Sequence, residues 1–141
     1  MKREAGFSLV EILVVLIILG LLVSVVAPTV LNQADSARVQ KVYADLANIE
    51  SALKLYRLDN YVYPSSEQGL GALLSASTLS PEPRNFKRGG YLDRMPRDPW
   101  GRVYLYLSPG EHGEFDLYSL GADGISGGEG QNADLGNWDV R

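Results

Sequence analysis

The sequence contains 141 residues, with a net charge of −4, one histidine and no cysteine. An acidic chain lacks the basic surface that phosphate binding requires, so nucleic acid is not an expected partner. Without cysteines, a small domain cannot rely on disulfides, and their absence prompts a search for a metal site. Residues 1–27 hold a short leader and an apolar run, which leaves room for one modest globular domain.

The apolar run at residues 7–27 carries no charge after Glu11. As a helix it would be roughly 31 Å long, which matches a hydrocarbon core of about 30 Å. A cleavable signal peptide is the alternative, but its apolar core usually spans about 7–15 residues before a small-residue cleavage site. This run is longer and lacks such a site, so it predicts a transmembrane helix. Lys2 and Arg3 predict a cytoplasmic N-terminus, with the rest of the chain translocated.

Glu11 lies one turn inside this helix. A carboxylate there costs about 2.5–3.5 kcal/mol at the bilayer centre and less near the edge. The side chain either reaches the headgroups or pairs with a cation. A cut after Gly6 would create an α-amine on Phe7, and that amine can meet Glu11 of the same helix or of a neighbouring one.

The string GFSLVE at residues 6–11, followed by an apolar helix, resembles the class III signal of type IV pilins and pseudopilins. The resemblance implies that residues 1–6 are a leader, which a prepilin peptidase in the membrane removes after Gly6. It also implies N-methylation of Phe7 and an assembly role for Glu11, which would meet the N-terminus of a neighbouring subunit.

Pro28 follows the apolar run and removes one helix hydrogen bond, which predicts a kink or a local opening. The helical pattern nevertheless continues, which predicts an amphipathic helix over residues 28–58. Arg38 and Lys41 on its polar face are expected to be solvated, with contact to an adjacent subunit as the alternative. Its apolar residues recur at spacings of three and four: Val39, Val42, Tyr43, Leu46, Ile49, Leu53 and Tyr56.

Residues 59–90 form the next segment. Ser65, with Gln68 three positions later, resembles a helix-capping pair and predicts a short helix over about residues 67–75. Residues 76–90 contain prolines and glycines without a clear period, which predicts a loop.

Residues 91–141 change to short alternating runs. Residues 103–107 and 115–119 are predicted to be antiparallel strands. Trp100 is expected to cover the edge of a small core. His112, in the turn between the strands, is expected to be solvated or hydrogen-bonded rather than a metal ligand.

The glycine-rich stretch at residues 120–139 is interleaved with carboxylates and amides. Oxygen-rich loops with tight turns suit Ca²⁺, which takes about 6–8 oxygen ligands. The spacing of an EF-hand is missing, and a disordered glycine tail is the alternative.

The C-terminal motifs closely resemble those of the major pseudopilins of type II secretion systems. These are DPWG at 98–101, the Pro-Gly, His-Gly and Asp positions at 109–116, SLGADG at 119–124 and Asn-Trp at 137–138. The resemblance covers essentially the entire chain. It implies an α+β, type IV pilin-like fold, with a long N-terminal helix packed on a small antiparallel sheet and a calcium-bound C-terminal loop.

In that family the C-terminal loop holds a structural Ca²⁺. The resemblance implies that the side chains of Asp123 and Asp134 are ligands. The further candidates are the carbonyl oxygens of Leu120 and Ser126, with Glu129 and Asn132 as competitors for a place.

The sequence has no catalytic constellation such as G-x-S-x-G, H-E-x-x-H or a phosphate-binding loop, so an enzyme is not expected. The resemblance implies a homopolymeric fibre in the envelope of a Gram-negative bacterium. Its subunits would wait in the inner membrane and be extracted by an assembly platform and a cytoplasmic motor. The fibre, with minor pseudopilins, would push folded proteins through an outer-membrane channel.

Two alternatives remain. An adhesive or DNA-uptake type IV pilin often carries a C-terminal disulfide loop, and the absence of cysteine argues against it. A single-pass protein with a periplasmic binding module predicts no cut after Gly6.

Overall fold

The structure, a computed structural model, describes residues 6–140, apart from the side chains of residues 28, 29 and 140. The chain divides into two compact units, Met1–Ala37 and Arg38–Arg141, which are described separately. The expectations for Lys2 and Arg3 lie outside the described residues.

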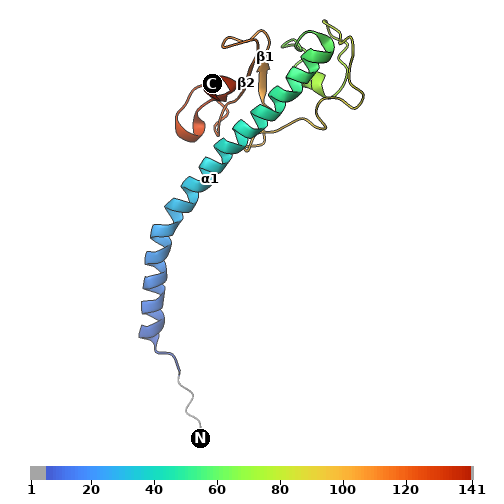
Figure 1. Cartoon of the computed structure of the whole chain (residues 1–141). Helices are drawn as coiled ribbons and strands as arrows, with labels where there is room; N and C mark the ends of the chain where they lie inside the picture. Colours follow the sequence, from blue (N-terminus) through green and yellow to red (C-terminus); the bar gives the residue numbers. More distant parts are fainter. Residues whose placement is uncertain (1–5, 141) are drawn as a thin grey trace. The chain divides into compact units, whose positions relative to one another are not determined.

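One helix, α1 (Leu9–Asn60), runs through both units (Figure 1). Ser8 caps its start, because the Ser8 hydroxyl accepts the backbone N–H of Val10 at 3.2 Å. The helix continues beyond Pro28, as expected, and ends two residues later than the expected residue 58.

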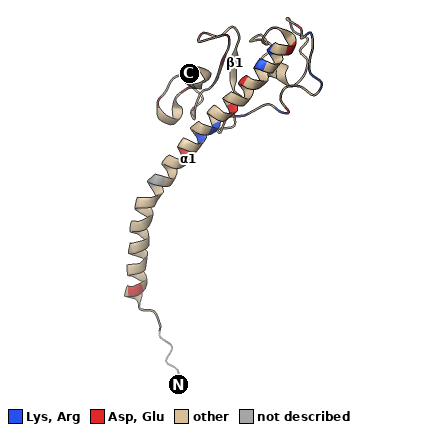
Figure 2. Cartoon of the chain, viewed as in Figure 1, with Lys and Arg blue, Asp and Glu red and all other residues tan. Residues whose placement is uncertain are grey.

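The first unit presents an apolar surface. Residues 9–27 of α1 are all exposed, and the helix contains a stretch long and apolar enough to cross a membrane. Apart from Glu11, the charged residues of α1 lie in its second half, from Asp35 onward, and Figure 2 shows this distribution.

The core of the second unit lies between α1 and the sheet. One stripe of α1 is fully buried there, and each such Leu or Ile contributes about 1.5–3 kcal/mol of transfer free energy. Trp100 is partly buried against this core, which confirms the expectation for it. The buried stripe comprises Val42, Leu46, Ile49, Leu53 and Tyr56, and the sheet region supplies Tyr104, Tyr106, Phe115, Leu117 and Leu135.

The sheet has three antiparallel strands in the order β1 (Leu105–Leu107), β2 (Asp116–Ser119) and β3 (Leu135–Gly136). The first two lie within the predicted strands but are shorter than predicted. Val103 makes only an isolated bridge with Arg97. The third strand was not predicted, because two residues in a glycine-rich run show no alternation.

The helix within the predicted span 67–75 is shorter than predicted and is a 3₁₀ helix. The capping pair is present: Gln68 N–H donates to Ser65 Oγ at 3.3 Å, and Ser65 N–H donates to Gln68 Oε1 at 2.8 Å. A turn and a four-residue 3₁₀ helix, η1 (Leu70–Leu73), follow it. Gly69, at φ 59°, interrupts the helical backbone, and glycine costs a helix about 1 kcal/mol relative to alanine.

Helix α1 ends at a strained residue. Tyr61 has φ 69°, a left-handed conformation that is rare for a bulky side chain. Its N–H donates to the Arg57 carbonyl at 2.7 Å, as in a helix C-cap that normally uses glycine. The Tyr61 side chain is 73% exposed, so it gains little burial in return.

Tyr61→Gly is therefore expected to stabilise the second unit by about 0.5–1 kcal/mol. A left-handed L-residue costs roughly 1–2 kcal/mol, and the larger conformational entropy that glycine loses on folding offsets part of the relief. Thermal unfolding of the full chain in detergent, followed by tryptophan fluorescence, measures the change. Tyr61→Ala removes the ring but keeps the Cβ, and should not stabilise. Equal melting temperatures for the two variants would contradict the strain.

Candidate functional site

The N-terminal signal lies at the start of α1. Gly6 and Phe7 precede the helix in irregular, exposed backbone, and the Phe7 side chain is 80% exposed. The bond between them is therefore accessible in this conformation. Glu11 lies in the first turn of α1, where the helix dipole favours a carboxylate.

The predicted calcium ligands lie in the loop after β2. Asp134 Oδ2 accepts the N–H of Gly127 at 2.9 Å and the hydroxyl of Ser126 at 3.3 Å. Asp134 Oδ1 is buried and has no hydrogen-bond partner among the described residues. Asp123 Oδ1 accepts the N–H of Ile125 at 3.0 Å, and Asp123 itself is exposed.

The loop is folded back on itself through backbone contacts. The Leu120 carbonyl accepts the N–H of Gly124 at 3.2 Å, and Ala122 N–H donates to the Gln131 carbonyl at 2.8 Å. Gly121, at φ 64°, leaves no room for a Cβ, which would lie 2.7 Å from the Ala133 carbonyl oxygen. These contacts give the glycine-rich run a defined conformation, unlike the disordered tail that was the alternative.

The donor set suits a hard cation. The predicted ligands offer only oxygen atoms, and a buried carboxylate oxygen without a partner is costly unless a cation satisfies it. Within residues 6–140, no group of three or more His, Cys, Asp or Glu side chains is placed to hold a metal. A cation here would therefore need backbone carbonyls as well as Asp123 and Asp134. The competitors are both exposed: Glu129 precedes the 3₁₀ turn η2 (Gly130–Asn132), and Asn132 is its last residue.

Buried Asp98 fixes the turn at residues 98–102 and joins it to β2, a role that the sequence does not reveal. Its Oδ1 accepts the N–H groups of Trp100 at 3.0 Å and Arg102 at 2.8 Å. Its Oδ2 accepts the hydroxyl of Ser119, in β2, at 2.7 Å. The Asp-Pro-Trp-Gly string was visible in the sequence, because an Asp before Pro commonly starts a turn.

A second buried carboxylate holds the turn between β1 and β2. Asp116 Oδ2 accepts the N–H of Glu111 at 2.8 Å and lies 2.9 Å from His112 Nδ1. Burial opposes the charge of Asp116, but the hydrogen bonds from His112 and Glu111 outweigh it and lower the Asp116 pKa below its usual value. His112 is therefore hydrogen-bonded, one of the two environments expected for it. Its ring also stacks on Trp138, with centroids 4.2 Å apart.

Asn137 extends the hydrogen bonding of the sheet. It begins the 3₁₀ turn η3 (Asn137–Val140). Its Oδ1 accepts the N–H of Leu117 at 3.1 Å, and its Nδ2 donates to the Phe115 carbonyl at 3.2 Å. One side chain therefore continues the ladder where β3 has ended.

Residues 29–138 match the family model "Type II secretion system (T2SS), protein G". The chain belongs to this family. Residues 1–27 match the prokaryotic N-terminal methylation motif.

Curated relatives agree with this assignment. The chain is 50% identical to the type II secretion system core protein G of Vibrio cholerae, over 100% of this chain and 96% of that protein. It is also 50% identical to the core protein G of Pseudomonas aeruginosa, over 98% and 97%.

A solved structure is also similar: the major pseudopilin from the type 2 secretion system of enterohaemorrhagic Escherichia coli. It matches at a TM-score of 0.70 and 48% identity, covering 77% of this chain and 93% of that one. The chain is accordingly a major pseudopilin, a structural subunit rather than a member of a known enzyme family. The expected long helix and small antiparallel sheet are confirmed.

Proposed function

We propose that this major pseudopilin is held in the inner membrane by residues 7–27, and then polymerises into a periplasmic fibre that drives export of folded proteins. The observation that carries the proposal is that residues 9–27 of α1 are apolar and exposed. So large an apolar surface needs lipid or another protein to cover it. Lipid covers it before assembly, and the same residues of neighbouring copies cover it in the fibre.

Cleavage between Gly6 and Phe7 prepares the subunit for assembly. The new α-amine on Phe7 would lie about one turn from Glu11, and on adjacent, staggered helices the two charges pair between subunits. This pairing gives the carboxylate a partner in apolar surroundings, where an unpaired charge is costly. The N-terminal methylation motif that matches residues 1–27 supports this processing.

The remaining partners follow from membership in the type II secretion family. Assembly into the pseudopilus implies other components of the same system. We assign them as a prepilin peptidase, an inner-membrane assembly platform with a cytoplasmic motor, and minor pseudopilins. With the N-terminus cytoplasmic, the second unit, Arg38–Arg141, would lie in the periplasm. Pro28 marks the place where α1 can open during assembly, because it cannot donate a helix hydrogen bond.

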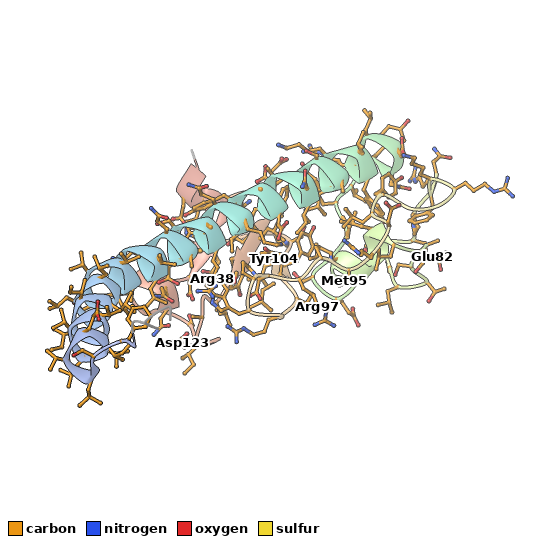
Figure 3. The ribbon with its side chains drawn as sticks, turned by 90° about the horizontal axis from the view of Figure 1, so that it is seen from below. Arg38, Glu82, Met95, Arg97, Tyr104 and Asp123 are labelled. Atoms are coloured by element: carbon orange, nitrogen blue, oxygen red, sulfur yellow. The ribbon has the colours of Figure 1, made fainter. Side chains whose placement is uncertain are left out.

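We also propose that the C-terminal loop binds a structural Ca²⁺. Asp123 and Asp134 would supply carboxylate oxygens, and Leu120 and Ser126 would supply carbonyl oxygens. In Figure 3, Asp123 and Glu82 lie toward opposite ends of the second unit. Asp134 Oδ1 supports the site most directly, because it is buried without a hydrogen-bond partner among the described residues and a cation would compensate it. In a chain without cysteine, this ion would take the role that disulfides have in other extracytoplasmic domains.

Glu11→Ala is expected to leave cleavage after Gly6 intact but to reduce fibre yield more than about tenfold, since the Phe7 amine would lose its partner in an apolar setting. Co-expression with a prepilin peptidase and the assembly components, followed by intact-mass measurement and electron microscopy of sheared fibres, tests both parts. Val10→Ala, with a similar truncation next to Glu11, is the control and should assemble. Normal fibres from Glu11→Ala would contradict the role of Glu11, and an uncut wild-type chain would contradict the processing.

Calcium is expected to raise the melting temperature of the full chain in detergent by several degrees relative to chelator. Binding to the folded state alone adds about 2.7 kcal/mol at 100 times the dissociation constant. Asp134→Asn should abolish the shift, and Asp123→Ala should do the same. Glu129→Gln tests the competing ligand and should keep most of the shift. A wild-type chain that melts at one temperature in both buffers would refute the calcium site.

A further inference from the structure

The Arg102 side chain lies against the C-terminal loop. Its Nη2 donates to the carbonyl of Gly121, and its Nε is buried without a hydrogen-bond partner among the described residues. The Nε end of the side chain is therefore shielded from water where it lies against this loop. The contact is to the turn that contains two of the proposed calcium ligands, Leu120 and Asp123.

The turn is shaped around the guanidinium group. Gly124 has φ +70°, and a Cβ at this position would lie 2.9 Å from Arg102 Cζ and 3.0 Å from Arg102 Nη1. Gly124 N–H closes the turn by donating to the Leu120 carbonyl at 3.2 Å. Arg102 therefore donates to the Gly121 carbonyl near the start of the turn, and its guanidinium group occupies the space that a Cβ at residue 124 would need.

The backbone of Arg102 is held by two hydrogen bonds with Asp98. Asp98 N–H donates to the Arg102 carbonyl at 2.8 Å, and Arg102 N–H donates to Asp98 Oδ1 at 2.8 Å. Asp98 in turn accepts the hydroxyl of Ser119 in β2 at 2.7 Å. The backbone of Arg102 is thus tied to β2 through Asp98, and its side chain extends to the loop.

We propose that Arg102 is a positioning residue for the cation loop, which holds the turn at residues 120–124 in its binding conformation before any cation arrives. The proposal rests on the calcium site proposed above. A loop that is already ordered binds its ion more tightly, because the ordering entropy is not lost during binding. The positive charge of Arg102 acts in the opposite direction, since it repels a cation. The sign of the effect on affinity therefore separates positioning from charge repulsion.

Calorimetric titration of the full chain in detergent with CaCl₂ tests this proposal. Arg102→Met should weaken calcium binding about tenfold, which is typical when an outer contact of a metal site is removed. Arg102→Lys keeps the charge and the stem and should restore part of the affinity. Arg94→Met removes the same charge from an exposed arginine and should leave calcium affinity unchanged.

Hydrogen exchange in chelator provides a readout that does not depend on calcium. The amides of Ala122 and Gly124, which close the loop, should exchange faster in Arg102→Met, while amides in the middle of α1 stay protected. If Arg102→Met disturbs the whole second unit, Arg102→Lys replaces it in the comparison with wild type. In Arg102→Lys, only the amides of Ala122 and Gly124 should exchange faster than in wild type.

Tighter or unchanged calcium binding by Arg102→Met would overturn the proposal, and so would unchanged exchange of Ala122 and Gly124. If the wild-type chain binds no calcium, the calcium site is wrong and the exchange data alone decide the role of Arg102. Faster exchange confined to the loop would then support positioning, and unchanged exchange would refute it.

Discussion

The apolar surface of residues 9–27 is the constraint on which the rest of the molecule depends. All of these residues are exposed, and no described part of the chain covers the most apolar window of the helix. The same helix, beyond residue 37, buries a stripe against a sheet in the manner of a soluble protein. The first part of α1 is thus suited to an apolar environment, and the second part to water and a protein core. The change from uncharged to charged sequence marks the boundary between the two parts (Figure 2). Such a subunit can reside in lipid and then move into a bundle of identical helices, because lipid and neighbouring helices both cover its apolar surface.

The second unit meets a different constraint, since its sheet is small and the chain has no disulfide. Hydrogen bonds from side chains to the backbone hold its turns and strands instead. Asp98 and Asp116 fix turns by accepting backbone N–H groups, and Asn137 continues the strand ladder. The two carboxylates are buried and hydrogen-bonded, which is what makes them stabilising. Asp134 Oδ1 is an exception, and it lies in the loop where an oxygen-binding cation would complete the network.

Several elements of the fold could be predicted from the sequence. The first half of the long helix was visible as an apolar run of membrane-spanning length, and its second half through apolar residues at spacings of three and four. The capping pair of Ser65 and Gln68 was visible as a local motif. The length and type of the helix after that pair could not be predicted, because residue spacing does not reveal the positive φ of Gly69. β3 was missed because two residues carry no periodicity. The support that Arg102 gives to the loop depends on contacts between segments 19 residues apart, which a linear pattern does not encode.

Cryo-electron microscopy of the assembled fibre tests the central claim most directly. The account predicts a core formed by residues 7–27 of many copies, with Glu11 of one subunit within ion-pair distance of the Phe7 amine of another. The second units would lie outside this core. A fibre held together only by contacts between the second units, with residues 7–27 absent from the axis, would contradict it.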